Sequence, residues 1–64
     1  MDALLLLRIK YLVNRAKKQE SKDDYAGAIS SYKKIVRLQP NNASANFKIA
    51  VCYYELQDLS NAAE

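Results

Sequence analysis

Histidine and tryptophan are missing from the 64-residue sequence, and glycine, proline and cysteine occur once each. Without histidine there is no histidine acid–base catalysis, and a lone cysteine supplies neither the roughly four ligands of a structural zinc site nor an intramolecular disulfide. A single glycine excludes the glycine-rich loops that bring backbone amides close to phosphates in P-loops and dinucleotide folds. We therefore expect no enzyme, and no catalytic, cofactor or metal site.

Long hydrophobic runs are missing as well. The four leucines at positions 4–7 are followed by Arg8 and Lys10, and they fall far short of the roughly 20 apolar residues that span a membrane. Met1 and Asp2 precede this run where a secretory signal has basic residues. Because Cys52 has no strong cluster of positive charge near it in the sequence except Lys48, one helical turn away, we expect it to be a small buried hydrophobe and not a reactive thiol. We also expect a cytoplasmic or other intracellular location, with the nucleus left open.

Size and composition favour a small folded unit. Hydrophobic residues make up 50% of the chain and charged residues 27%, which is not the composition of a disordered segment. A domain near this length buries only about 60% of the surface that its unfolded chain exposes, so its stability is marginal without packing partners. The net charge is +3, with the basic excess in residues 1–40 and a mildly acidic remainder in residues 41–64.

An apolar stripe predicts a first helix over roughly residues 3–21. Its members recur at spacings of three and four residues, which places them on one face of a helix: Leu5, Ile9, Leu12, Ala16 and Gln19. The opposite face carries the basic residues Arg8, Lys10 and Lys17.

A second helix is predicted to start at Asp23 or Asp24, because either carboxylate can accept hydrogen bonds from the free amides of a first turn. Its apolar residues again recur three or four apart: Tyr25, Ala28, Ile29, Tyr32, Ile35, Val36 and Leu38. Pro40 disfavours helical geometry in the residue before it, so the helix must end there. Asn41 or Asn42 can then cap the next helix.

A third helix is predicted at about residues 43–56. Its core stripe is expected to be Ala45, Ile49, Ala50, Tyr53 and Leu56, while Phe47, Val51 and Tyr54 fall on another side. Asp58 is expected to cap a fourth helix, of which only the first residues, including Leu59, Ala62 and Ala63, are present. Because the connections are short, successive helices must run antiparallel. The sequence thus predicts an all-α fold of helix-turn-helix units, with three full helices and a truncated fourth.

The roles of the residues repeat at a spacing of 34 positions, which is a known solenoid period. Small packing residues, helix caps and apolar helix openers coincide in the two copies: Ala16 with Ala50, Asp24 with Asp58, Ala28 with Ala62, and Tyr25 with Leu59.

These units resemble the tetratricopeptide repeat, whose signature places an aromatic residue, Leu-Gly, Tyr, Ala, Phe and Pro at fixed intervals. In the first unit Ala28 and Pro40 match, Leu12 stands in the aromatic place, Ala16 takes the small-residue place and Tyr32 replaces Phe, while Arg15 and Gln19 depart from the pattern. The second unit fits at Ile49, Ala50, Tyr53 and Ala62 and departs at Asn46. The resemblance implies an α-solenoid. It divides the chain into an N-terminal helix extension at residues 1–8, a first repeat at residues 9–42 and an incomplete second repeat at residues 43–64.

The nearest alternative fold is a three-helix bundle like the microtubule-interacting and trafficking domain, which also binds peptides. It shares the pattern of an acidic turn followed by Tyr, Ala-Ile and Tyr. Pro40 and Asn41 argue against this alternative, because a bundle of that kind would continue the helix that they break.

The resemblance implies a protein–protein interaction module that presents a helical groove to a peptide or a partner helix. The groove positions that it assigns are Lys10, Val13, Lys17, Glu20, Phe47, Val51, Tyr54 and Glu55. Phe47, Val51 and Tyr54 form an apolar stripe outside the predicted core, and such a stripe is expected to pack against another protein surface. That surface belongs to a partner protein, to a further repeat of a larger array or to another copy of the chain. A homo-oligomer can form through this stripe or through Leu4, Leu5, Leu6 and Leu7.

A basic helical module that binds nucleic acid is the alternative from a different class. Residues 1–40 are basic, and Tyr11, Tyr25 and Tyr32 are aromatic residues of the kind that stack on bases. However, two of these tyrosines lie on predicted core stripes, and a net charge of +3 is small for binding driven by counterion release. We therefore expect a protein partner, and neither nucleic acid nor a membrane surface.

Overall fold

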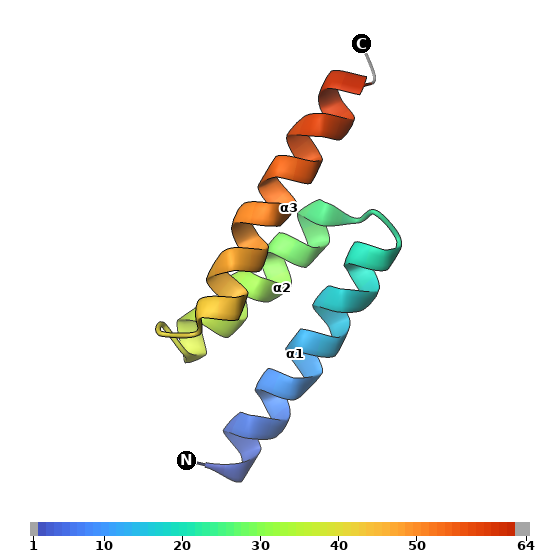
Figure 1. Cartoon of the computed structure of the whole chain (residues 1–64). Helices are drawn as coiled ribbons and strands as arrows, with labels where there is room; N and C mark the ends of the chain where they lie inside the picture. The colour runs from blue at the N-terminus through green and yellow to red at the C-terminus, as the bar shows by residue number, and fades with distance from the viewer. Residues whose placement is uncertain (1, 63–64) are drawn as a thin grey trace.

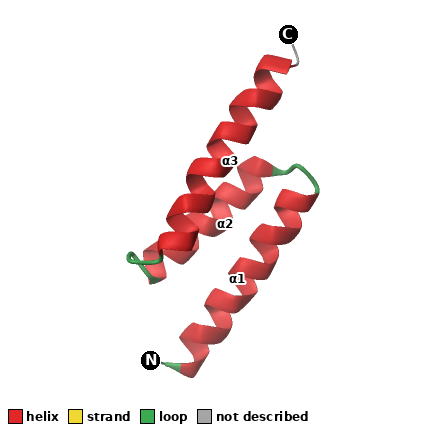
Figure 2. Ribbon diagram, viewed as in Figure 1, coloured by secondary structure: helices red, strands yellow, loops and turns green. Residues whose placement is uncertain are grey.

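The computed structural model describes residues 2–62, with side chains described for residues 2–58. Three helices follow one another along the chain: α1 (Ala3–Ser21), α2 (Tyr25–Leu38) and α3 (Ala43–Ala62) (Figure 1). Helices and short loops, without strands, make up this part of the chain (Figure 2). α1 and α2 form an antiparallel hairpin, and α3 packs on α2 as the second hairpin. The predicted all-α fold of helix-turn-helix units is confirmed.

A polar side chain fixes the start of each helix. The Asp2 side chain accepts a hydrogen bond from the Leu4 N–H at 3.1 Å, and Asp24 accepts one from the Gly27 N–H at 3.1 Å. Asn42 accepts one from the N–H of residue 45 at 3.0 Å. These bonds pair backbone donors that the first turn of a helix leaves free. Of the two predicted candidates at each later start, the structure selects Asp24 and Asn42.

The turn between α1 and α2 contains a residue in left-handed backbone geometry. Asp23 has φ of 59°, and its N–H donates to the Glu20 carbonyl at 3.0 Å. The Asp24 N–H donates to the Gln19 carbonyl at 2.8 Å. This pair of bonds is the Schellman arrangement, in which glycine is the usual left-handed residue. The turn therefore closes α1 tightly, at the cost of placing a side chain where glycine is favoured.

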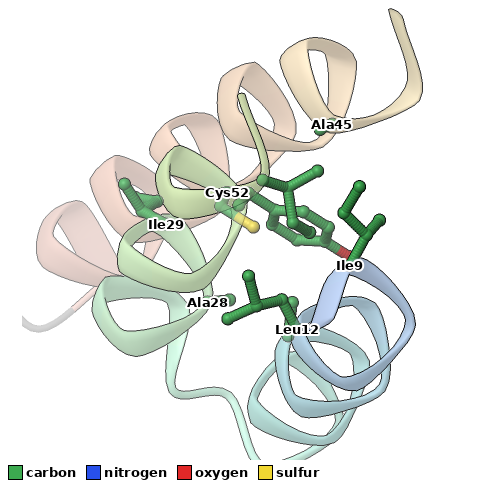
Figure 3. Close-up of a cluster of buried hydrophobic side chains, with 9 residues drawn as sticks. Ile9, Leu12, Ala28, Ile29, Ala45 and Cys52 are labelled. Carbon is green, nitrogen blue, oxygen red and sulfur yellow. The ribbon is translucent and has the colours of Figure 1, made fainter. Parts of the chain in front are cut away.

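One hydrophobic core lies between the three helices. Its buried residues come from α1 (Ile9, Leu12, Ala16), α2 (Ala28, Ile29, Tyr32, Ile35) and α3 (Ala45, Cys52) (Figure 3). Ala16 and Ala28 have no exposed surface, which agrees with their predicted role as small packing residues. The predicted stripes of the first two helices and the burial of Cys52 are confirmed.

The buried face of α3 differs from the predicted core stripe. Ala45 and Cys52 are buried and Ile49 is partly buried, but Ala50 is exposed and Tyr53 and Leu56 are 48% and 38% exposed. Positions 45, 49 and 52 are separated by four and three residues and so share the face that packs on α2. The prediction was wrong for Ala50, Tyr53 and Leu56, because it chose the neighbouring face of the helix.

The predicted break before a fourth helix is also wrong. α3 continues without interruption from Ala43 to Ala62, so Asp58 lies inside the helix and does not cap a new one. Neither proline nor glycine occurs after Pro40, and nothing else in this stretch is strong enough to stop a helix. Ala63 lies outside the described residues. The division at residues 8/9 and 42/43 stays a prediction, since helix bounds alone do not define repeats.

Candidate protein-interaction surface

A groove lies between α1 and α3, over α2; we call it the α1–α3 groove. It has a volume of about 360 Å³ and is lined by Val13, Lys17, Tyr32, Ile35, Asn42, Ser44, Ala45 and Lys48. Tyr32, Ile35 and Ala45 are core residues, so the groove has a largely apolar base. Lys17 is exposed and the Lys48 side chain is 42% exposed, which places positive charge at its edges. Such a groove suits apolar ligand side chains with carboxylates beside them.

The Glu20 carboxylate joins all three helices beside this groove. One of its oxygens accepts a hydrogen bond from the Tyr32 hydroxyl at 2.8 Å. The other lies 3.5 Å from the Lys48 Nζ and accepts a longer hydrogen bond, 3.7 Å, from the Cys52 thiol. Because the Tyr32 ring is buried, its hydroxyl needs this partner. Glu20 thus connects α1 to α2 and to α3.

Burial and this carboxylate change two nearby pKa values in the same direction. Burial raises the pKa of the Tyr32 hydroxyl, and the hydrogen bond to Glu20 and its negative charge raise it further. Burial also raises the pKa of the Cys52 thiol, and the Glu20 charge adds to that effect, while Lys48 partly opposes it. Both groups are therefore neutral near pH 7, and Cys52 is not an activated nucleophile.

The side of α3 that faces away from α2 carries an apolar stripe, which we call the outer stripe: Phe47, Val51 and Tyr54. Phe47 and Tyr54 are 68% and 70% exposed, and Val51 is partly buried. Phe47 lies five residues before Cys52 and Tyr54 two residues after it. At 3.6 residues per turn, both therefore lie on roughly the opposite side of the helix axis from the buried thiol. α3 is therefore apolar on two sides.

The residues predicted as groove positions separate into two groups. Val13 and Lys17 line the α1–α3 groove, Glu20 lies beside it, and Lys10 is exposed on α1. On α3, Phe47, Val51 and Tyr54 form the outer stripe, and Glu55 is partly buried. Their role in binding stays a prediction.

Three groove-lining residues, Asn42, Ser44 and Lys48, were missed by the sequence reasoning. Lys48 was missed because its partner Glu20 lies 28 positions earlier, and only the packing of α3 brings the two together. Asn42 and Ser44 could have been assigned to the groove from the sequence, because they flank the predicted start of the third helix, and the first turn of that helix lies at the groove.

The fold and the groove define a class: helical hairpins stacked so that their helices enclose a shared surface, as in α-helical repeat scaffolds. A tetratricopeptide repeat family description matches residues 21–64, and the chain belongs to the tetratricopeptide repeat family. This family consists of protein-interaction modules on a non-enzymatic scaffold. No curated protein and no solved structure matches the chain at a significant level.

Within residues 2–62, no helix combines the length and apolar character needed to cross a membrane. In the same part of the chain, no cluster of three or more Cys, Asp or Glu side chains is arranged to hold a metal ion.

Proposed function

We propose that the chain binds an extended peptide or a helix of a partner protein across the α1–α3 groove and the outer stripe of α3. The observation that carries this proposal is the exposure of Phe47 and Tyr54, at 68% and 70%. Aromatic side chains gain much free energy from burial and frequently act as anchors in protein interfaces. Two of them on one helix face, four and three residues from Val51, match the spacing of a helix-binding surface.

The charge pattern of α3 supports the same conclusion. Lys48 is the one charged residue between positions 43 and 54, and it points toward Glu20, not toward the outer stripe. A helix that faces water normally carries charged residues on its solvent side, whereas a helix that is apolar on two sides is normally covered on both. We infer that a partner covers the second side.

The α1 side of the groove supplies charge for orienting a ligand. Lys10 and Lys17 are exposed on α1, and Val13, between them, lines the groove. A ligand whose apolar residues lie on Val13 and Val51 would place flanking carboxylates near these lysines. The same proposal includes the cytoplasmic location expected from the sequence.

Peptides selected for binding test this function while the natural partner is unidentified. Panning a phage-displayed library of random peptides of about 12 residues provides ligands, whose affinity is then measured by fluorescence anisotropy. The double variant Phe47→Asp, Tyr54→Asp should bind them at least about tenfold more weakly, because the loss of even one aromatic anchor, worth about 2 kcal/mol, exceeds the roughly 1.4 kcal/mol of a tenfold change. Its thermal unfolding should change little, since both side chains are exposed.

The control is the double variant Ala26→Asp, Ser30→Asp, which adds the same two negative charges at exposed positions on α2 that do not line the α1–α3 groove. It should bind the selected peptides as the wild type does. Equal binding to the wild type and to the outer-stripe variant, or equal loss in both variants, would contradict the proposed surface.

A further inference from the structure

A second groove lies in the seam between α1 and α2, and none of its lining comes from α3. We call it the seam groove. Its volume is about 320 Å³, and six residues line it: Arg8, Tyr11 and Leu12 from α1, and Lys34, Arg37 and Leu38 from α2. It shares no residue with the α1–α3 groove, so an inference about it does not depend on the proposed function.

The charges of the seam groove all have the same sign. Arg8, Lys34 and Arg37 are exposed, and no lining residue carries a carboxylate. Among the described residues, no acidic side chain forms an ion pair with these three cations. One turn further along α1, Arg15 adds a fourth cation and donates a hydrogen bond to the Tyr11 hydroxyl at 3.3 Å. A negatively charged ligand would therefore be attracted by every charged group of this groove.

The base of the seam groove is apolar. Leu12 is buried, Leu38 is partly buried, and the Tyr11 side chain is 60% exposed between the cations. Leu4 continues the surface toward the N-terminus, because Leu4, Arg8, Tyr11 and Arg15 are four, three and four residues apart and share one face of α1. The groove thus offers apolar contacts in the middle and cationic hydrogen-bond donors at its edges.

We propose that the seam groove is a docking site for an acidic amphipathic segment of a partner protein. Apolar side chains of that segment contact Tyr11 and Leu38, and its carboxylates pair with the arginines and the lysine around them. Arginine favours this arrangement because its planar guanidinium binds a carboxylate through two parallel hydrogen bonds.

Nucleic acid fits the same surface less well. Single strands bind by stacking successive bases on several exposed aromatic rings. Tyr11 is the one tyrosine that lines the seam groove, and of the other two tyrosines in residues 1–40, Tyr32 is buried and Tyr25 is partly buried. A lipid surface fits less well too. Leu4 and Leu7 share one face of α1, but the exposed Leu6 lies on another side, so the three leucines do not form a single apolar face.

The test uses the whole chain and a synthetic probe. The probe is a fluorescein-labelled helical peptide of about 14 residues, the length of α2, with leucines three and four apart and glutamates elsewhere. A second peptide has glutamine in place of every glutamate. Anisotropy titrations at about 20 mM and about 150 mM salt should show binding of the acidic peptide alone, and weaker binding at the higher salt.

Two double variants with the same charge change locate the site. Arg8→Gln, Lys34→Gln should weaken binding roughly five- to tenfold, which corresponds to two ion pairs of moderate strength. The control is Lys22→Gln, Lys33→Gln, which should leave binding unchanged. Lys22 lies in the turn after α1, and Lys33, although next to Lys34 in the sequence, lies over the Tyr53 ring of α3 at 5.6 Å. Tyr11→Ser tests the apolar base and should also weaken binding, which provides a second readout if the first variant unfolds.

Four results would overturn the proposal. The first is no binding of the acidic peptide at low salt, and the second is equal weakening by both double variants, which would indicate a response to net charge. The third is tighter binding of an oligothymidine of the same charge or of phosphatidylserine vesicles. The fourth is sedimentation showing that the wild type self-associates, that Arg8→Gln, Lys34→Gln does not, and that the probe does not dissociate the wild-type oligomer.

Discussion

Replacing Glu20 by alanine is expected to loosen the packing of α3 and α2 against α1. The change removes the acceptor of the Tyr32 hydroxyl, the acceptor of the Cys52 thiol and the ion-pair partner of Lys48 in one step. No other single side chain of the described residues contacts groups on both other helices through so many polar bonds.

The magnitude follows from the burial of the partners. Tyr32 is 3% exposed, and a buried hydroxyl left without a partner costs about 1–3 kcal/mol. The Lys48 side chain is 42% exposed, so the lost ion pair adds only about 0.2–1 kcal/mol. We expect a total loss of about 2–3 kcal/mol in the free energy of unfolding. In a domain of this size, that loss corresponds to a fall in Tm of roughly 10–20 °C.

Urea denaturation followed by circular dichroism measures this loss. The matched control is Glu20→Gln, whose amide oxygen still accepts from the Tyr32 hydroxyl, so that only the charge is removed and the cost should be about 1 kcal/mol or less. The double variant Glu20→Ala, Tyr32→Phe removes the unpaired hydroxyl as well and should cost less than the sum of the single changes. Equal stability of the alanine and glutamine variants would refute the reasoning, because the hydroxyl would then not depend on Glu20.

Three further predictions concern the turn, the buried thiol and the pH dependence. Asp23→Gly should stabilise the chain by about 0.5–1 kcal/mol in urea denaturation, whereas Asp23→Ala should not, because only glycine relieves the left-handed geometry; equal effects of the two would contradict this. Cys52 should react with a thiol reagent much more slowly than a cysteine peptide does, and faster in Glu20→Ala than in the wild type; a fast reaction of the native chain would show that α3 is not docked. Since the folded state raises the pKa of Tyr32 above its ordinary value of 10.0, the resulting stabilisation is present below about pH 10 and is lost at higher pH. Tyr32→Phe should therefore show a smaller alkaline loss of stability in pH-dependent melts, and an identical loss would argue against this assignment.

The first two helices were predictable because their signals are local. Asp24 and Asn42 cap helix starts through bonds to residues three positions later, and Pro40 ends a helix through the chemistry of its own ring. From Arg8 onward, polar residues interrupt the apolar residues of α1 and α2, so their periodicity selects a single face. Sequence reasoning therefore placed these helices and their buried stripes correctly.

The buried face of α3 was not predictable in the same way. Residues 49–54 are apolar without interruption, so periodicity does not distinguish the face of Cys52 from that of Tyr53. Packing against α2 decides between them, and it buries Cys52 while leaving Tyr53 half exposed. The same reasoning explains the error at Asp58, since aspartate favours helix caps but is tolerated inside a helix.

The polar contacts at the candidate surface depend on the tertiary fold. Glu20 meets Tyr32 twelve positions away, Lys48 28 positions away and Cys52 32 positions away. No spacing rule for a single helix relates such positions. Val13 and Lys17, which line the α1–α3 groove, were nevertheless assigned to the inner side of the first helix by the family resemblance, and their role in binding stays a prediction.

The central claim is that the α1–α3 groove and the outer stripe bind a protein ligand, and chemical-shift mapping tests it most directly. A ¹⁵N-labelled chain is titrated with a peptide obtained by phage panning, and the amide shifts are followed by NMR. We predict that the largest changes occur at Val13, Lys17, Val51 and Tyr54. Changes confined to the turn at Asp23, or to the seam groove around Arg8 and Lys34, would contradict it.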